Sequence, residues 1–162
     1  MLMRNFRAAN LSDTKRCFEI ETTAYEGDEA ATEAKIAKRI ATYPEGFLIA
    51  EVEGRVVGFI NSGCAYEVEM SDEAFKELKG HDPAAPNVVI LSVVVDPAEQ
   101  GKGHSRALMD EFLGQMRRMG KERMHLMCKD HHVSLYEMFE YQYSKPSAEL
   151  PPENRTVTEA TI

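Results

Sequence analysis

The stretch LSVVVDPAEQGKGHSRALM, residues 91–109, carries the strongest structural signal in this chain of 162 residues. Its first half continues a nearly unbroken apolar run that begins at Val88, which is typical of a strand buried on both faces of a sheet. Its second half places Gly101 and Gly103 directly before a helix expected over residues 103–119. A strand, a glycine loop and a helix in this order indicate an α/β protein, with this strand at the centre of the sheet.

The other elements follow from changes in hydrophobic period along the chain. Asp28 is a helix N-cap residue type, and Glu53-Gly54 suits a tight turn between antiparallel strands. A last strand is expected to include Tyr141 and Tyr143. The remaining predicted segments are a strand ending near residue 10, helices over 11–25 and 28–43, strands over 47–52 and 55–65, a short helix over 71–80, a strand over 124–128 and a short helix over 133–139.

The composition changes at Lys145. Residues 145–162 contain three prolines, few large apolar residues and no sustained period. We therefore expect one domain over residues 1–144, followed by a loosely held tail over 145–162 that contains no strand.

Charge and cysteine content exclude several classes of protein. There are 27 acidic and 19 basic residues, which argues against a nucleic-acid partner, because phosphate backbones are held by clustered Lys and Arg. The longest apolar runs fall far short of the roughly 20 residues that cross a bilayer. The N-terminus lacks the apolar core of a signal peptide, and the three scattered cysteines give no disulfide framework. We expect a cytoplasmic monomer or homodimer with no membrane partner.

The glycine loop predicts an anion site. Glycines let the backbone approach a phosphate closely, and the first N–H groups of a helix have no partner within that helix. The alternative is that the glycines merely shape a tight turn. Two familiar phosphate motifs do not fit: a Walker A loop needs Lys after its second glycine, where His104 stands, and a dinucleotide fingerprint follows a first strand rather than a fourth.

Gln100, Gly103 and Ser105 occupy the places of the acetyl-CoA loop of the GCN5-related N-acetyltransferase (GNAT) superfamily, although Ser105 departs from the usual small residue. The chain most resembles the serotonin (arylalkylamine) N-acetyltransferase group from about Arg7 to Pro146. The segments FEIETTAY, TYPEGFLIAEVEGRVVGFI, LSVVVDPAEQGKG and LMCKDHHVSLYEMF carry the resemblance. It implies a mixed α/β sheet, splayed between its fourth and fifth strands, with helices on both faces.

The resemblance also implies an acyltransferase in which an amine attacks acetyl-CoA directly within a ternary complex. Tyr136 matches the family tyrosine that gives a proton to the departing CoA thiolate, a sensible role for a phenol with a pKa of about 10; taken alone, it is an ordinary packing residue. An amide of the fourth strand would polarise the acetyl carbonyl. The residues that would bind acetyl-CoA are Val93, Val94 and Val95 for the acetyl and pantetheine portion, and Gly101, Lys102, Gly103, His104, Ser105 and Arg106 for the pyrophosphate.

The residues that accept the proton in the family do not match the residues of this chain. The animal enzymes have two histidines on the fourth strand, where this chain has Val89 and Leu91. Candidates for the base are Glu21, Glu67, Glu69 or an ordered water, while the alternative is that these acids form solvated faces.

The acceptor is expected to be a small primary amine with an aromatic or other apolar group. Residues that could line its site, or simply belong to the core, are Phe18, Tyr25, Tyr66 and Met70. No metal is expected, since Cys128, His131 and His132 have no second ligand pair at finger-like spacing. The altered site and C-terminus leave two alternatives open: an acetyl-CoA-binding module with little transfer, and an acetyltransferase acting on a protein N-terminus or lysine.

Overall fold

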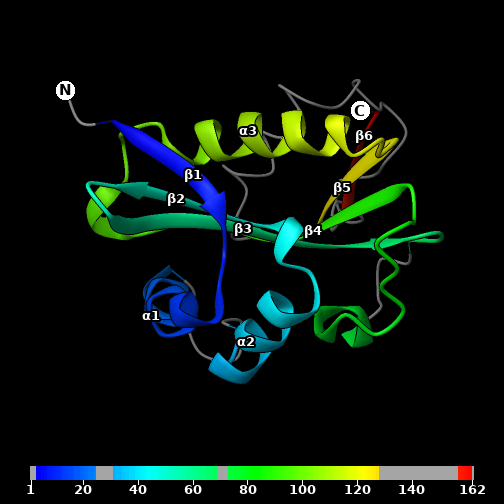
Figure 1. Ribbon diagram of the computed structural model, residues 1–162, viewed down its shortest axis with the longest axis horizontal. Coiled ribbons are helices and arrows are strands. Elements are labelled where there is room, and N and C mark those ends of the chain that lie inside the picture. Colours follow the sequence, from blue (N-terminus) through cyan, green and yellow to red (C-terminus); the bar gives the residue numbers. More distant parts are fainter. Residues whose placement is uncertain (1–2, 25–30, 69–72, 128–156, 162) are drawn as a thin grey trace.

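The computed structural model describes residues 3–24, 31–68, 73–127 and 157–161 (Figure 1). Its α-helices are α1 (Thr14–Ala24), α2 (Glu33–Thr42) and α3 (His104–Arg118). Short 3-10 helices are η1 (Leu11–Asp13), η3 (Pro44–Gly46), η4 (Glu73–Glu77) and η5 (Pro97–Glu99). The strands are β1 (Arg4–Ala8), β2 (Phe47–Val52), β3 (Arg55–Ala65), β4 (Asn87–Val95), β5 (Arg123–Met127) and β6 (Val157–Thr161).

The strands form one mixed sheet in the order β1-β2-β3-β4-β5-β6. All neighbouring pairs are antiparallel except β4 and β5, which are parallel. Helix α3 covers one face of the sheet, and α1 and α2 cover the other (Figure 1). This confirms the predicted α/β architecture with helices on both faces. None of the helices within the described ranges is long and apolar enough to span a bilayer.

Each face of the sheet has its own apolar core. On one side, Leu108, Phe112 and Met116 of α3 are fully buried against the sheet. On the other, Ile20 of α1 and Ile36 of α2 pack with residues of β2, β3 and β4. The helical period predicted for these segments therefore corresponds to real contact faces.

The sheet opens where β4 continues beyond its last pair with the parallel strand β5. The β4–β5 pairing extends only from Asn87↔Arg123 to Ile90↔Leu126, whereas β4 continues to Val95. The predicted splay between these two strands is thus confirmed. In addition, the β3–β4 register shifts between Asn61 and Ser62, which leaves Leu91 as an extra residue on β4, a β-bulge.

Several local predictions need correction. Helix α2 begins at Glu33 with Thr32 as its N-cap, later than the expected start at Asp28, because the Thr32 side chain accepts a hydrogen bond from the Lys35 amide. The expected helix over 71–80 is the 3-10 helix η4, and it ends where Leu78 takes a positive φ of 61°.

The prediction of no strand in 145–162 is wrong, because β6 pairs antiparallel with β5. The predicted helix over 133–139, the strand with Tyr141 and Tyr143, and the boundary between 144 and 145 lie outside the described residues.

Candidate active site

The loop before α3 has a backbone that only glycine adopts easily. Gly101 and Gly103 have φ values of +80° and +79°, and Gly103 is the N-cap of α3. A Cβ atom built on either glycine would meet nothing within 4 Å, so this side of the loop is open. Because the first N–H groups of α3 lack intrahelical partners, an anion can bind here through backbone amides. Lys102 is exposed nearby, with its ammonium 2.8 Å from the Glu99 carboxylate.

The second part of the site is the free edge of β4. Beyond Ile90, β4 has β3 on one side but no β5 residue opposite it on the other among the described residues. The side chains of Val93 and Val95 are buried in the core beneath α3, and Val94 is buried in the core beneath α1 and α2. Among the described residues, the backbone groups on the β5 side of these residues have no strand partner, and a ligand that enters the splay could bind them there.

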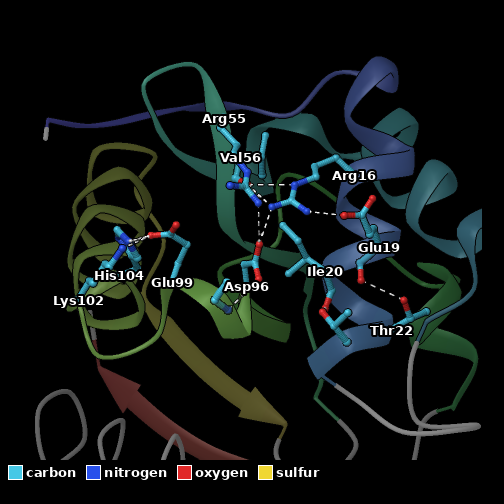
Figure 2. Close-up of polar contacts among 12 residues, drawn as sticks. Arg16, Glu19, Ile20, Thr22, Arg55, Val56, Asp96, Glu99, Lys102 and His104 are labelled. Carbon is cyan, nitrogen blue, oxygen red and sulfur yellow. Dashed lines mark hydrogen bonds and ion pairs between the residues drawn. The ribbon is translucent and has the colours of Figure 1, made fainter.

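Asp96 joins the end of β4 to α1 and to the loop (Figure 2). Its Oδ2 accepts from Arg16 Nη2 at 2.6 Å, and its Oδ1 accepts from the Ala98 amide at 3.0 Å, which caps η5. Arg16 also donates to the Val56 carbonyl, through Nε at 3.2 Å and Nη2 at 3.0 Å. Burial alone would raise the pKa of Asp96, but the Ala98 amide and Arg16 outweigh it and lower the pKa. This junction holds the exit of β4 against α1.

A contact from β1 holds the loop itself. Arg4 Nε donates to His104 Nδ1 at 2.8 Å, and Arg4 Nη2 donates to the Lys102 carbonyl at 3.1 Å. His104 is buried, and its Nε2 lies 3.8 Å from Glu99 Oε2. Burial and the Arg4 charge both lower the pKa of His104. The imidazole is therefore neutral, as it must be to accept the Arg4 hydrogen bond.

A buried carboxylate lies on α1, which covers the face of the sheet opposite α3 (Figure 1). Glu21 is 3% exposed, and its Oε1 accepts a hydrogen bond from the Ala31 amide at 3.2 Å. Its Oε2 is buried and has no hydrogen-bond partner among the described residues. Burial raises the pKa of Glu21. A carboxylate with a free oxygen and a raised pKa is suited to accept a proton near neutral pH.

A series of hydrogen-bonded polar side chains connects α2 with β4 on the same face of the sheet. Arg39 Nη1 donates to Asn61 Oδ1 at 3.2 Å, and Asn61 Nδ2 donates to Ser92 Oγ at 2.7 Å. Arg39 Nε also donates to the Lys76 carbonyl at 3.0 Å. Arg39, Asn61 and Ser92 are all buried. This series of hydrogen bonds ends at Ser92, beyond the last described β4–β5 pair at Ile90.

Comparison with known families identifies the family to which the chain belongs. A family model described as the acetyltransferase (GNAT) family matches residues 12–141. The chain belongs to the GNAT acetyltransferase family. The match contains both β4 and the loop before α3, the two open parts of the site. No functionally curated protein matches the chain in sequence.

Solved GNAT structures share the architecture at low sequence identity. The loading GNATL domain of CurA from Lyngbya majuscula has a TM-score of 0.72 and 20% identity, covering 92% of this chain and 71% of that chain. The GNAT-like decarboxylase GphF, in complex with isobutyryl-CoA, has a TM-score of 0.69 and 23% identity, covering 85% and 75%. Diaminobutyrate acetyltransferase EctA from Paenibacillus lautus, with its substrate and coenzyme A, has a TM-score of 0.66 and 15% identity, covering 99% and 92%. These likenesses support the GNAT fold.

The GNAT fold brings some of the predicted site residues together and not others. Residues 93–95 lead through Asp96 and η5 into the loop 101–103 and the first turn of α3, so the predicted acetyl-CoA residues form one continuous segment. Phe18 is partly buried against the core beneath α1 and α2, whereas Tyr66 is 62% exposed. The predicted residues outside the described ranges are Tyr25, Glu69, Met70, Cys128, His131, His132 and Tyr136.

The β4 positions that replace the family histidines are apolar in their surroundings. Val89 packs with Ala65 and Phe75, and Leu91 is partly buried against this group. Neither position offers a proton acceptor. Sequence reasoning did not single out Arg4, Arg16 or Arg39. The signal that could have done so is an arginine that shares a predicted helix or strand face with apolar residues.

Proposed function

We propose that this protein is an acetyl-CoA-dependent N-acetyltransferase that acetylates a primary amine, with an arylalkylamine-like acceptor. One observation carries the proposal: in a chain of the GNAT family, the open edge of β4 leads through Asp96 and η5 into a glycine loop at the N-terminus of α3. The sequence resemblance to the arylalkylamine group supports the choice of acceptor. The net charge of −8 favours a cationic amine over an anionic acceptor.

The residues present fit acetyl-CoA. When bound, this co-substrate supplies an acetyl group already activated as a thioester. The open left-handed glycines and the amides of Ser105 and Arg106 would hold the pyrophosphate, and the free β4 backbone at residues 93–95 would hold the pantetheine and acetyl carbonyl. Because the surrounding protein is acidic, backbone amides and the helix terminus must supply most of the attraction.

We favour Glu21 among the three candidate bases. It is buried with a free oxygen, whereas Glu67 is exposed and Glu69 lies outside the described residues. In the proposed reaction, Glu21 takes a proton from the ammonium, directly or through a water, and the neutral nitrogen attacks the acetyl carbonyl. A C–N bond forms, the C–S bond breaks, and Tyr136 gives a proton to the departing thiolate. The acetylated nitrogen then gives its second proton to the Tyr136 phenolate, directly or through water, which leaves a neutral amide and a neutral phenol. An amide of Val93 or Val95 stabilises the oxyanion.

Acetylation can be tested by following CoA thiol release with acetyl-CoA against aryl and alkyl amines and short peptides. We expect turnover with at least one arylalkylamine. Turnover with peptides alone would instead indicate a protein acetyltransferase. Tight acetyl-CoA binding with no turnover on any acceptor would indicate a binding module, and the proposed function would be wrong.

Tyr136→Phe tests the proposed general acid. We expect kcat to fall by about 10²-fold or more, because the thiolate would leave without a proton, while acetyl-CoA affinity stays within about twofold. Steady-state kinetics and calorimetric titration measure the two quantities, with Tyr66→Phe, an exposed tyrosine, as the matched control. An unchanged kcat in Tyr136→Phe would rule out the acid role.

Arg4→Met tests the contact that holds the loop. We expect acetyl-CoA to bind about five- to tenfold more weakly, because two hydrogen bonds to the loop segment are lost. Arg118→Met, at the exposed far end of α3, is the matched control and should bind normally. Equal affinities in the two variants would show that Arg4 does not position the loop.

The same contact should make acetyl-CoA binding sensitive to acid. The pKa of His104 is lowered in the folded protein, so its contribution is fully present above the ordinary value of 6.5 and is lost as the pH falls through the lowered pKa. Protonated His104 cannot accept from Arg4, although Glu99 would offset part of the new charge. We expect the dissociation constant to rise several-fold between about pH 8 and about pH 5. His104→Gln, which accepts without titrating, should flatten this dependence.

A further inference from the structure

Arg39 is an unusual residue for the interior of this protein. Its relative exposure is 5%, and among the described residues no carboxylate lies within ion-pair distance of it. Its hydrogen bonds go instead to two neutral oxygens, the Lys76 carbonyl and Asn61 Oδ1. A guanidinium buried in this way loses its hydration, so a nearby negative charge must offset part of the cost.

That negative charge is Glu21. The Arg39 charge opposes the rise that burial causes in the pKa of Glu21, and the Glu21 charge opposes the fall that burial causes in the pKa of Arg39. The Cys17 thiol, on the same helix as Glu21, is neutral because burial raises its pKa to about 12. The strands packed against α1 bring the uncharged Asn61 and Ser92 to this side of the sheet. Glu21 and Arg39 are thus two buried groups of opposite charge on the helices α1 and α2, which pack against each other.

The hydrogen bonds of Arg39 fix where its charge lies. Asn61 receives Arg39 through its oxygen and uses its amide to donate to Ser92 on β4. The Lys76 carbonyl, at η4, holds the guanidinium from the other side. The charge is therefore anchored directly to β3 and η4, and through Asn61 to β4.

We propose that Arg39 is a positioning residue for the reaction: its anchored charge keeps the buried Glu21 anionic at neutral pH, ready to accept the proton of the amine. This inference rests on the proposed function, in which Glu21 is the base. Arg39 acts through Glu21 and touches neither acetyl-CoA nor the amine.

The test compares Arg39→Met with Arg39→Lys. In Arg39→Met, Glu21 stays buried without its cation, so the acid limb of kcat/KM against pH should move up by about one pH unit, and kcat/KM at pH values on that limb should fall by up to about tenfold. Activity should recover at higher pH. Arg39→Lys keeps the charge and should restore most of the profile. Lys38→Met, which removes an exposed charge from the same helix, should leave the profile unchanged.

A second measurement does not depend on turnover. Carbon-13 NMR of the Glu21 carboxyl in the resting protein should show its titration midpoint move to higher pH in Arg39→Met. Because loss of Arg39 could also impair folding, Asn61→Asp provides an independent variant: it leaves Arg39 in place but gives it a competing carboxylate. The Glu21 midpoint should rise there as well.

The outcomes separate the two proposals. An unchanged Glu21 titration in folded Arg39→Met and Asn61→Asp would overturn the inference. A shifted titration with an unchanged pH–rate profile would also overturn it, while leaving the N-acetyltransferase activity intact. If the wild-type protein acetylates no amine, the proposed function fails, and a shifted titration would still support the Arg39–Glu21 pairing.

Discussion

Glu21→Gln should lower kcat/KM for the amine by about 10²- to 10⁴-fold, the range expected when a general base is removed. Glutamine keeps the shape of the side chain and can still accept the Ala31 hydrogen bond, so the loss would come from the missing proton acceptor. Acetyl-CoA affinity should be unchanged, because the loop before α3 lies on a different segment. Steady-state kinetics at saturating acetyl-CoA measures the effect.

Stability provides an internal check on this variant. The pKa of Glu21 is raised in the folded state, so its contribution to stability is present below its ordinary value of 4.5 and is lost as the pH rises through the raised pKa. Ionised Glu21 therefore costs stability at neutral pH, and Glu21→Gln should melt at the same temperature or higher. Glu67→Gln, at an exposed carboxylate, is the matched control and should keep full activity. Full activity in Glu21→Gln would leave water or another group as the base.

Gly103→Val should weaken acetyl-CoA binding by at least about 10²-fold. The backbone of Gly103 has a φ of +79°, which costs an L-residue about 1–2 kcal/mol, and more for a β-branched one. The new side chain would also project into the open space where we place the pyrophosphate. Strain in the loop and steric exclusion of the phosphate act in the same direction, so binding should be close to undetectable by calorimetry.

Gly120→Val separates these two causes. Gly120 also has a φ of +79° and open space at its Cβ position, but it lies beyond the other end of α3. The two variants should lose similar thermal stability, and only Gly103→Val should lose acetyl-CoA binding. An equal loss of affinity in both would contradict the assignment of the loop as the phosphate site.

The elements with strong local signals were predictable from the sequence. The apolar run of β4, the helical period of α3 and the Glu53-Gly54 turn all lie where the pattern indicated, and both turn residues have positive φ values of 52° and 78°. Strand β6 was missed because its sequence, VTEAT, is largely polar and follows a proline-containing segment. Its β-branched residues, Val157, Thr158 and Thr161, were a weak signal in favour of a strand.

Some features of the candidate site were likewise predictable from the sequence, and others were not. The loop was predictable because its chemistry lies in consecutive residues, and Glu21 was one of several acids that sequence alone could not rank. The Arg4–His104 contact joins residues 100 positions apart, and Asn61 and Ser92 are 31 apart. Such pairs depend on the order and register of the strands, which a single sequence does not contain. Burial, which distinguishes Glu21 from Glu67, is likewise a property of the packed fold.

The extra residue at Leu91 puts the two halves of β4 out of phase. Val88 and Ile90 before it, and Val93 and Val95 after it, all face the core beneath α3, which a strictly alternating strand would not allow. If Leu91 were instead taken into a regularly alternating strand, the second half of β4 would turn over, which would bring the Ser92 hydroxyl into an apolar core and exchange the backbone groups that line the splay. An insertion or deletion elsewhere in β4 that leaves the bulge in place would turn one half of the strand over in the same way, whereas deletion of Leu91 itself would keep Val93 and Val95 facing α3.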